Sequence, residues 1–226
     1  MQKHEKKEVE FFGKITAGST HEMKNVLAII RESCGLMEDL MALSRETPIP
    51  HREKFQKALA TVKVQIQRGV EITDRLNRFA HSPDAEITRI DLHEMAEQLV
   101  TLASRFARLK NVSLHTGPSG QPLAVVTCPV RLLMALFGCI ECCLHAIPLG
   151  SKIYIRPQKK GETYALQIAC EGDFPKPADS AQSMAAADRW PDLEQTVASL
   201  GGSVELDAAG PGIWLLLPEA LPRPPK

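Results

Sequence analysis

The chain lacks net charge. Its 27 basic and 27 acidic residues cancel over 226 residues, so the overall charge gives no indication of a nucleic-acid partner. It also lacks a long apolar run, since no stretch approaches the roughly 18 residues that a membrane-spanning helix needs. The first seven residues lead into a charged segment without the apolar region of a secretion signal. We therefore expect a soluble, cytoplasmic protein that binds neither nucleic acid nor membrane.

Cysteine is sparse and unevenly spaced, with six residues in the chain. This pattern is typical of free thiols rather than of a disulfide framework. Cys139, Cys142, Cys143 and His145 are close enough in sequence to raise the alternative of a metal site. They lie within an apolar helical run, however, and no second pair of ligands follows at zinc-site spacing. We expect buried small side chains here and no metal.

The first part of the chain is predicted to be a helical hairpin. Prolines near residue 48 end one helical segment and permit the next. Both segments carry apolar residues at alternating spacings of four and three, which form the seam of packed helices. In the first segment these are Met23, Leu27, Ile30, Cys34, Met37 and Met41, and in the second Phe55, Leu59, Val62, Ile66, Val70, Thr73, Leu76 and Phe79. A single hairpin leaves two such stripes partly exposed, so we expect a homodimer whose hairpins form a four-helix bundle.

The helical pattern stops at residues 81–84, where a proline follows a serine. We therefore divide the chain into a hairpin domain at 1–82 and a second domain at 86–221. In the second domain, Asp91 is positioned to cap a helix at 92–109. Further helices are expected at 130–146 and 191–200, and strands at 112–115, 123–127, 152–157, 164–169, 203–207 and 212–217, with a loop at 173–188. This order predicts an α+β protein in which an α/β sandwich, with helices on one face of a sheet, follows the hairpin.

His21, Glu22 and Asn25 form the most informative pattern. A separation of four residues returns to nearly the same helical face, so Asn25 lies one turn from His21, and Glu22 flanks both. His21 is two residues from the seam position Met23 and should face water. A neutral imidazole can accept a phosphoryl group, and an adjacent carboxylate can orient or deprotonate it. An exposed histidine on a charged helix commonly has no role, so the function of His21 has to be judged from the rest of the chain.

Several segments, taken in order, identify a resemblance. They are His21-Glu22-Met23-Lys24-Asn25, the end of the second hairpin helix at 72–80, Ile90-Asp91-Leu92, Gly201-Gly202 with Val204-Glu205-Leu206, Gly210-Pro211-Gly212, and Leu216-Leu217-Pro218. Residues 11–218 thereby resemble the cytoplasmic core of a sensor histidine kinase. The resemblance implies a dimerisation and histidine-phosphotransfer hairpin followed by a Bergerat-type ATPase domain.

The chain differs from this family at the positions that bind ATP in the family. Glu141 stands at the position of the family's magnesium-binding asparagine. A carboxylate can bind magnesium, but it also repels the triphosphate. Two unit charges about 4 Å apart repel by about 4 kcal/mol at an effective dielectric constant near 20.

The next two nucleotide motifs are also altered. Cys170 replaces the aspartate that accepts the adenine amino group, and an unpaired donor there costs about 1–3 kcal/mol. Gly172 remains, but Phe174 places a ring where a second glycine would admit the ligand. The glycine-rich phosphate loop would align near 187–190, which contains no glycine. We expect a domain that has kept the ATPase fold and lost ATP, and therefore no cofactor.

The resemblance then narrows to ATP-independent histidine phosphotransferases, which relay phosphate between the aspartates of response-regulator receiver domains. It implies His21 as the phosphoacceptor, Glu22 as base or orienting group, and Asn25 as a group that positions water if the protein acts as a phosphatase. The receiver would supply the magnesium. Three alternatives remain at this stage: an ATP-dependent kinase with an unusual nucleotide site, a response-regulator phosphatase, and a non-catalytic docking adaptor.

Overall fold

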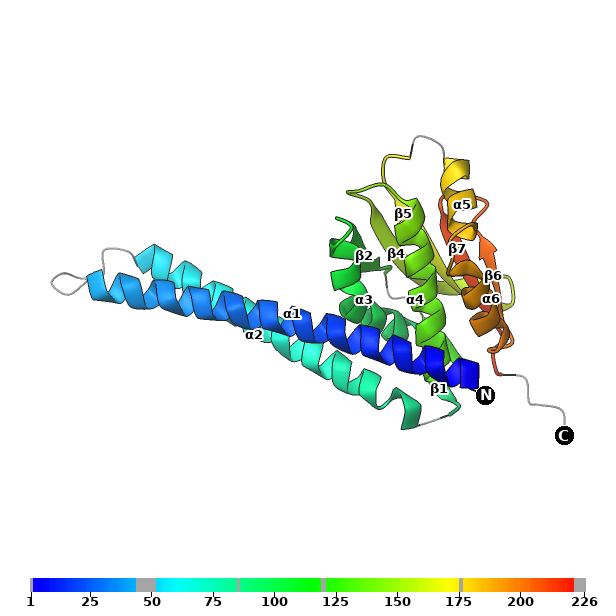
Figure 1. Ribbon diagram of the computed structural model, residues 1–226, viewed down its shortest axis with the longest axis horizontal. Helices are drawn as coiled ribbons and strands as arrows, with labels where there is room; N and C mark the ends of the chain where they lie inside the picture. Colours follow the sequence, from blue (N-terminus) through cyan, green and yellow to red (C-terminus); the bar gives the residue numbers. More distant parts are fainter. Residues whose placement is uncertain (1, 44–51, 85, 119–120, 175–176, 222–226) are drawn as a thin grey trace.

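The computed structural model describes residues 2–43, 52–84, 86–118, 121–174 and 177–221. It consists of a long helical hairpin that projects from an α/β part (Figure 1). Helix α1 (Gln2–Leu43) and helix α2 (Arg52–Ala80) form the hairpin. The segment between them, where the prolines near residue 48 lie, is outside the described residues. The first half of α1 crosses the α/β part, where the hairpin packs against helices of that part.

The hairpin ends as its sequence predicts. Helix α2 stops at Ala80, and a short 3-10 turn, η1 (Ser82–Asp84), follows. The Ser82 hydroxyl donates a hydrogen bond to the Phe79 carbonyl at 2.6 Å. This bond satisfies one of the carbonyls that a helix leaves open at its end. Phe79 itself is 1% exposed and anchors the end of α2 in the core.

The α/β part contains a five-stranded sheet with the order β2-β4-β5-β7-β6. Strands β2 and β4 are parallel, and the other neighbours are antiparallel. Two further strands, β1 and β3, pair separately. The strands are β1 (Thr88–Asp91), β2 (Ser113–Thr116), β3 (Ala124–Thr127), β4 (Lys152–Lys160), β5 (Thr163–Glu171), β6 (Ser203–Leu206) and β7 (Gly212–Leu217). Four helices cover one face of the sheet, which confirms the predicted sandwich (Figure 1).

The covering helices are α3 (Leu92–Arg108), α4 (Pro129–Ala146), α5 (Pro177–Ala185) and α6 (Trp190–Ala198). Asp91 caps α3 as predicted, because its side chain accepts hydrogen bonds from the backbone N–H groups of His93 and Glu94 at 2.7 and 3.3 Å. Alternate residues of β4, among them Ile153 and Ile155, are fully buried beneath these helices. The core therefore lies between the sheet and its helical cover.

Two elements differ from the sequence-based expectation. Helix α5 lies within 173–188, where we expected a loop, and β1 precedes α3 without having been predicted. Met184 and Ala187 are buried, and α5 packs against α4. Tertiary packing stabilises a short helix that its own sequence favours only weakly.

Helix α4 is more apolar than expected. Over its 18 residues it reaches the length and composition of a membrane-spanning helix, so the expectation that no apolar stretch approaches that length was wrong. The helix is 61% buried within the protein. Its burial identifies it as the central helix of the core, and its apolar character follows from contact with its neighbours on several sides.

Candidate phosphoacceptor site

The imidazole of His21 is exposed on α1, as predicted, and Asn25 is exposed one turn further along. Ile15 and Val26, which face other directions on the same helix, are 0% and 2% exposed and fix the orientation of α1. A shallow hollow of about 690 Å³ runs along α1 beside the imidazole. Its lining consists of Val9, Phe12, Gly13, Thr16, Ala17, Thr20, His21 and Lys24. A phosphorylated side chain of another protein can therefore approach this histidine from solvent.

The Glu22 side chain lies on a different face of α1 from His21. It is 8% exposed and forms ion pairs with Arg68 of α2 and with Arg108 at the end of α3. Each of its two oxygens contacts one guanidinium group. Glu22 thus ties the hairpin to the α/β part. The two arginines take most of the hydrogen-bonding capacity of the Glu22 carboxylate. Its role as a base for His21 stays a prediction.

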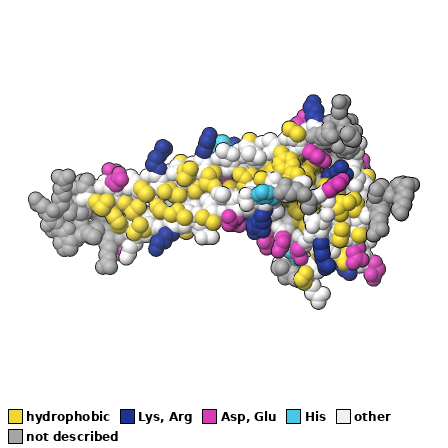
Figure 2. All heavy atoms as spheres, turned by 90° about the horizontal axis from the view of Figure 1, so that it is seen from below, with side chains coloured by type: hydrophobic (Ala, Val, Ile, Leu, Met, Phe, Trp, Pro, Cys, Tyr) yellow, Lys and Arg dark blue, Asp and Glu magenta, His cyan; other side chains and the backbone are white. Residues whose placement is uncertain are grey.

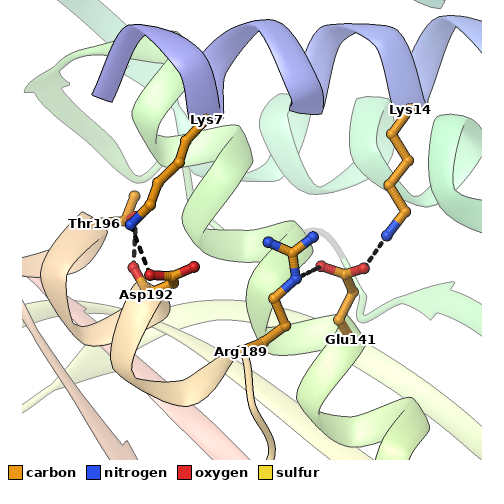
Figure 3. A network of polar contacts seen from close by, with 6 residues as sticks. All are labelled: Lys7, Lys14, Glu141, Arg189, Asp192 and Thr196. Atoms are coloured by element: carbon orange, nitrogen blue, oxygen red, sulfur yellow. Dashed lines mark hydrogen bonds and ion pairs between the residues drawn. The ribbon is translucent and has the colours of Figure 1, made fainter. Parts of the chain in front are cut away.

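A second carboxylate, Glu141 of α4, binds two cations from opposite sides (Figure 3). Lys14 reaches it from α1, and Arg189, directly before α6, approaches its other oxygen at 3.3 Å. The Glu141 side chain is 20% exposed. Nearby, Lys7 of α1 pairs with Asp192 of α6 at 2.7 Å. These ion pairs hold the first turns of α1 against α4 and α6.

Aromatic rings fill the contact below these ion pairs. Phe11 of α1 packs against Phe137 of α4 and Phe79 of α2, with ring centroids 5.6 and 5.5 Å apart. Phe137 also contacts Phe106 of α3 at 5.3 Å. The Lys14 ammonium lies 5.0 Å from the Phe137 centroid and 5.6 Å from that of Phe106. The hairpin and the α/β part therefore share one apolar contact.

One of the hollows beside Glu141 is smaller than a typical ligand site. The cavity between α1, α4 and α6 has a volume of about 140 Å³, whereas small-molecule sites in proteins typically measure roughly 300–1,000 Å³. Lys14, Glu141 and Arg189 all line this cavity. The carboxylate at the family's magnesium position is already neutralised by two protein cations. Lys14 and Arg189 thus occupy the carboxylate that would have to hold the metal of a nucleotide.

Cys170 and its neighbours also lack the features of an adenine pocket. Cys170 is 6% exposed on β5, and it forms a hydrogen bond with the thiol of Cys143 that, together with burial, raises the pKa of Cys143. Phe174 packs against the core. A Cβ on Gly172 would lie 2.5 Å from the Ser151 hydroxyl oxygen, so a side chain at this position would displace that hydroxyl.

All six cysteines are free thiols, as expected. Burial raises the pKa of Cys142 to about 12, and the charge of Glu141 adds to this shift. Burial likewise raises the pKa of Cys139. Among the residues that the structure describes, no three His, Cys, Asp or Glu side chains lie close enough together to hold a metal ion. The thiols of α4 therefore act as small core side chains.

The sequence did not predict the partners of the two carboxylates. Lys14 is two helical turns before His21, and Arg189 lies in the stretch noted only for its missing glycines. Arg68 and Arg108 belong to helices for which the sequence pattern indicated only the apolar faces. The only available signal was that Glu22 and Glu141 are acidic residues within otherwise packed helical faces, which favours a cationic partner.

Comparisons with known proteins give matches only at the level of structure. No family model matches the chain, and no curated protein matches it. The nucleotide-free catalytic domain of the histidine kinase ThkA aligns with a TM-score of 0.50 and 16% identity, over 61% of this chain and all of that domain. Acinetobacter baumannii histidine kinase AdeS gives a TM-score of 0.46 and 13% identity, over 88% of this chain and 98% of that one.

A further match is the crystal structure of ThkA in complex with the response regulator protein TrrA. It has a TM-score of 0.44 and 15% identity, and the alignment covers 95% of this chain and 64% of that one. At such identities a structural likeness concerns the fold alone. The alignment with the ThkA domain, the sheet order and the preceding hairpin agree with the resemblance of the sequence motifs. The chain has the fold of a histidine kinase core, with a helical hairpin followed by an ATPase-like α/β domain.

Proposed function

We propose that the chain is a cytoplasmic histidine phosphotransferase that exchanges a phosphoryl group between His21 and the aspartate of a response-regulator receiver domain, without using ATP. One observation carries this proposal. The phosphoacceptor histidine is exposed, while the carboxylate at the family's magnesium position is bound to Lys14 and Arg189. An exposed acceptor and an occupied carboxylate at the magnesium position both support a donor other than ATP.

The transfer step requires little from this chain beyond the imidazole. A ring nitrogen of neutral His21 attacks the phosphorus of the receiver's aspartyl phosphate. The new P–N bond forms as the P–O bond to the aspartate breaks, and the electron pair leaves with the carboxylate. The reverse step returns the phosphoryl group to an aspartate. The receiver's own magnesium balances the charge of the transferred group.

The loss of ATP follows from charge and space. Binding of a magnesium nucleotide would have to displace Lys14 or Arg189 from Glu141, and a freed carboxylate about 4 Å from a phosphate costs about 4 kcal/mol. The domain contact would also have to open, because the first turns of α1 cover this part of α4. The alternative of an ATP-dependent kinase requires both changes.

A phosphatase activity is the second candidate, and the position of Asn25 favours it. Its amide is exposed one turn from His21 and can hold a water molecule near a phosphorylated aspartate. Replacement of Asn25 by Ala then lowers the rate at which a phospho-receiver loses phosphate to water, while transfer to His21 remains. Equal hydrolysis by both forms would exclude this role.

We also propose that the protein is a homodimer. Several large apolar side chains of the hairpin are exposed in the single chain, and they lie at the spacing of a packed seam. On α1 they are Val9, Leu27 and Met41 at 71, 58 and 56% exposed, and on α2 Leu59, Ile66 and Val70 at 41, 51 and 50%. Figure 2 shows apolar atoms that continue along the hairpin. A second hairpin would cover this stripe and complete a four-helix bundle.

The dimer is testable by one substitution. Leu27→Glu places a charge in the proposed seam and should shift the protein from dimer to monomer in sedimentation equilibrium. Glu32→Lys, an exposed change on the same helix, is the matched control. A wild-type protein that sediments as a monomer at micromolar concentration would contradict the proposal.

The phosphotransfer proposal is tested with His21→Ala and a control at His115, another exposed histidine. A panel of receiver domains, phosphorylated with labelled acetyl phosphate, is incubated with each protein. Label should move to the wild type and to His115→Ala, and not to His21→Ala. If the His21→Ala protein binds the receivers and takes up label as the wild type does, the histidine is not the acceptor. Receiver binding without any transfer by the wild type would support the adaptor alternative instead.

A further inference from the structure

One lysine of α1, Lys24, has no carboxylate partner. Lys6, Lys7 and Lys14 of the same helix each pair with an acidic residue, whereas Lys24 forms no ion pair with any residue that the structure describes. Its side chain is exposed one turn after His21. An exposed lysine is ordinary by itself, so a role for Lys24 depends on what surrounds it.

Lys24 and His21 line the same hollow along α1, which has a volume of about 690 Å³. Because the two residues are three positions apart on a helix, they are separated by roughly 60° around the axis and about 4.5 Å along it. Side chains at this spacing are neighbours on the helix surface. The flexible stem of Lys24 therefore lets its ammonium group reach the space in front of the imidazole, where a phosphoryl group must lie for attack.

The hollow has a positive group and no negative one. Of the eight residues that line it, Lys24 alone carries a permanent charge, and none is a carboxylate. Glu22, the acidic residue next to His21, is paired with two arginines instead. The Thr20 hydroxyl donates its hydrogen to the Thr16 carbonyl at 2.7 Å, so it does not offer a free donor to an oxyanion. The charge of the hollow therefore suits an anionic group held by one ammonium.

The proposed dimer leaves this end of the hollow open. At about 100° per residue, Lys24 lies roughly 60° and His21 roughly 120° from the seam residue Leu27 around the helix axis. Val9, at the other end of the hollow, points in the same direction as Leu27. A second hairpin would thus cover the apolar end of the hollow, while Lys24 stays at the edge of the seam and His21 outside it.

We propose that Lys24 is a catalytic residue whose ammonium group binds the phosphoryl oxygens during transfer to and from His21. The inference rests on the proposed function and deepens it, since it names the group of this chain that holds the transferred phosphoryl group. Negative charge is spread over the three non-bridging oxygens while the P–N bond forms and the P–O bond to the aspartate breaks. Lys24 stays protonated throughout, because it donates hydrogen bonds to these oxygens and transfers no proton.

The same contact acts after the receiver has left. The receiver takes its magnesium with it, so the phosphohistidine that remains depends on this chain for a countercharge. Arg68 and Arg108, the cations closest to His21 along the chain contact at Glu22, are already paired with that carboxylate. Lys24 is the cation that remains free to stabilise the phosphorylated imidazole.

The test separates contact with the phosphoryl group from contact with the partner protein. Phosphoramidate is a small phosphoryl donor without a protein surface, and its protonated nitrogen leaves as ammonia when His21 attacks the phosphorus. Lys24→Met removes the charge and keeps an unbranched stem, whereas Lys24→Arg keeps the charge. Arg31→Met is the matched control, because it removes an exposed cation from nearly the same face of α1 about 10 Å further along.

Lys24→Met should accept label about tenfold or more slowly from both phosphoramidate and a phospho-receiver, because a donor to the developing charge is lost. Lys24→Arg should recover most of the rate, and Arg31→Met should match the wild type. With the receiver that exchanges label fastest with the wild type, the loss should appear in kcat. The Kd of the unphosphorylated receiver should be the same for Lys24→Met and the wild type.

Three results would contradict the inference. If Lys24→Met is labelled as fast as the wild type by both donors, Lys24 does not touch the phosphoryl group, while the proposed function stands. If the loss is confined to the receiver and its binding is weakened, Lys24 contacts the partner protein and not the phosphoryl group. If phosphoramidate labels the wild type but no receiver exchanges phosphate with it, the proposed function fails and this inference fails with it.

Discussion

Glu22 and Glu141 are two carboxylates that each bind two cations, and in each case one of the two cations lies across the contact between the hairpin and the α/β domain. The residues that differ from the kinase family were recognisable in the sequence, because Glu141 and Cys170 stand in motifs of known spacing. Their partners were not predictable, since Lys14 is 127 residues from Glu141 and Arg108 is 86 residues from Glu22. Pairing over such separations depends on the packing of whole helices, and local patterns do not encode it.

Glu22→Gln should destabilise the protein. The change leaves Arg68 and Arg108 without their common countercharge, at side chains that are 39% and 45% exposed. We expect a loss of about 1–3 kcal/mol in the free energy of unfolding by urea. Glu10→Gln, which affects only an exposed pair with Lys6, should cost about 0.5 kcal/mol or less. Equal effects of the two substitutions would show that Glu22 is not the connection described here.

Asp207 should contribute to stability at neutral pH and not in acid. Partial burial alone would raise the pKa of this carboxyl group, but hydrogen bonds and a nearby positive charge outweigh it and hold the pKa below its usual value. The groups responsible are the Ala209 N–H, Gln167, Trp214 and Lys160. A lowered pKa in the folded state stabilises the fold above the unfolded pKa of about 3.9, and this contribution disappears as pH falls through the folded value.

The measurement compares wild type with Asp207→Asn in urea at several pH values. The stability difference in favour of the wild type should be constant between pH 5 and 7 and should shrink as pH falls below about 4. A difference that grows in acid would mean that the pKa of Asp207 is raised in the folded protein.

At the scale of elements, the sequence predicted most helices and strands because their boundaries carry local signals. Asp91 caps α3, Pro129 begins α4, and Gly201 takes a positive φ of 68° after α6. Helix α5 was missed because a segment of 9 residues is too short to be a stable helix on its own, and contact with α4 decides its structure. Strand β1 was missed because four residues are too few to show a period.

Gly202 should not tolerate a side chain. A Cβ at this position would lie 2.2 Å from the Leu216 carbonyl oxygen, a backbone atom of the paired strand β7. Gly202→Ala should therefore lower the free energy of unfolding by about 3 kcal/mol, at the upper end of the usual cost of overpacking. Gly210→Ala, where a Cβ meets nothing within 4 Å, is the matched control and should be nearly neutral. A neutral Gly202→Ala would contradict the register of β6 and β7.

At the scale of the whole molecule, the hairpin and the ATPase-like domain form one unit. Phe11 and Ile15 of α1 belong to the same buried cluster as the residues of α3, α4 and the sheet. The general architecture was predictable from the order of the motifs. The placement of the domain on α1 was not, because it depends on rings and ion pairs contributed by five different helices.

Thiol reactivity reports on this packing. Cys139, Cys142 and Cys143 are 0% exposed. Burial raises the pKa of Cys139 and Cys142, and the hydrogen bond with Cys170 together with burial raises that of Cys143, so these thiols are both covered and protonated near pH 7. In the native protein, iodoacetamide should modify Cys34 and Cys128, which are partly exposed, well before these three. Peptide mass spectrometry over a time course gives the order. Early modification of the α4 cysteines would show that the helix is not covered as described.

The central claim is that His21 receives its phosphoryl group from a receiver domain and not from ATP. The most direct measurement incubates the purified protein in parallel with γ-labelled ATP and magnesium, and with a receiver domain carrying labelled aspartyl phosphate. The account predicts acid-labile label on His21 only from the receiver, and none in the His21→Ala protein. Label on His21 from ATP would contradict it and would mean that Lys14 and Arg189 leave Glu141 to admit a nucleotide.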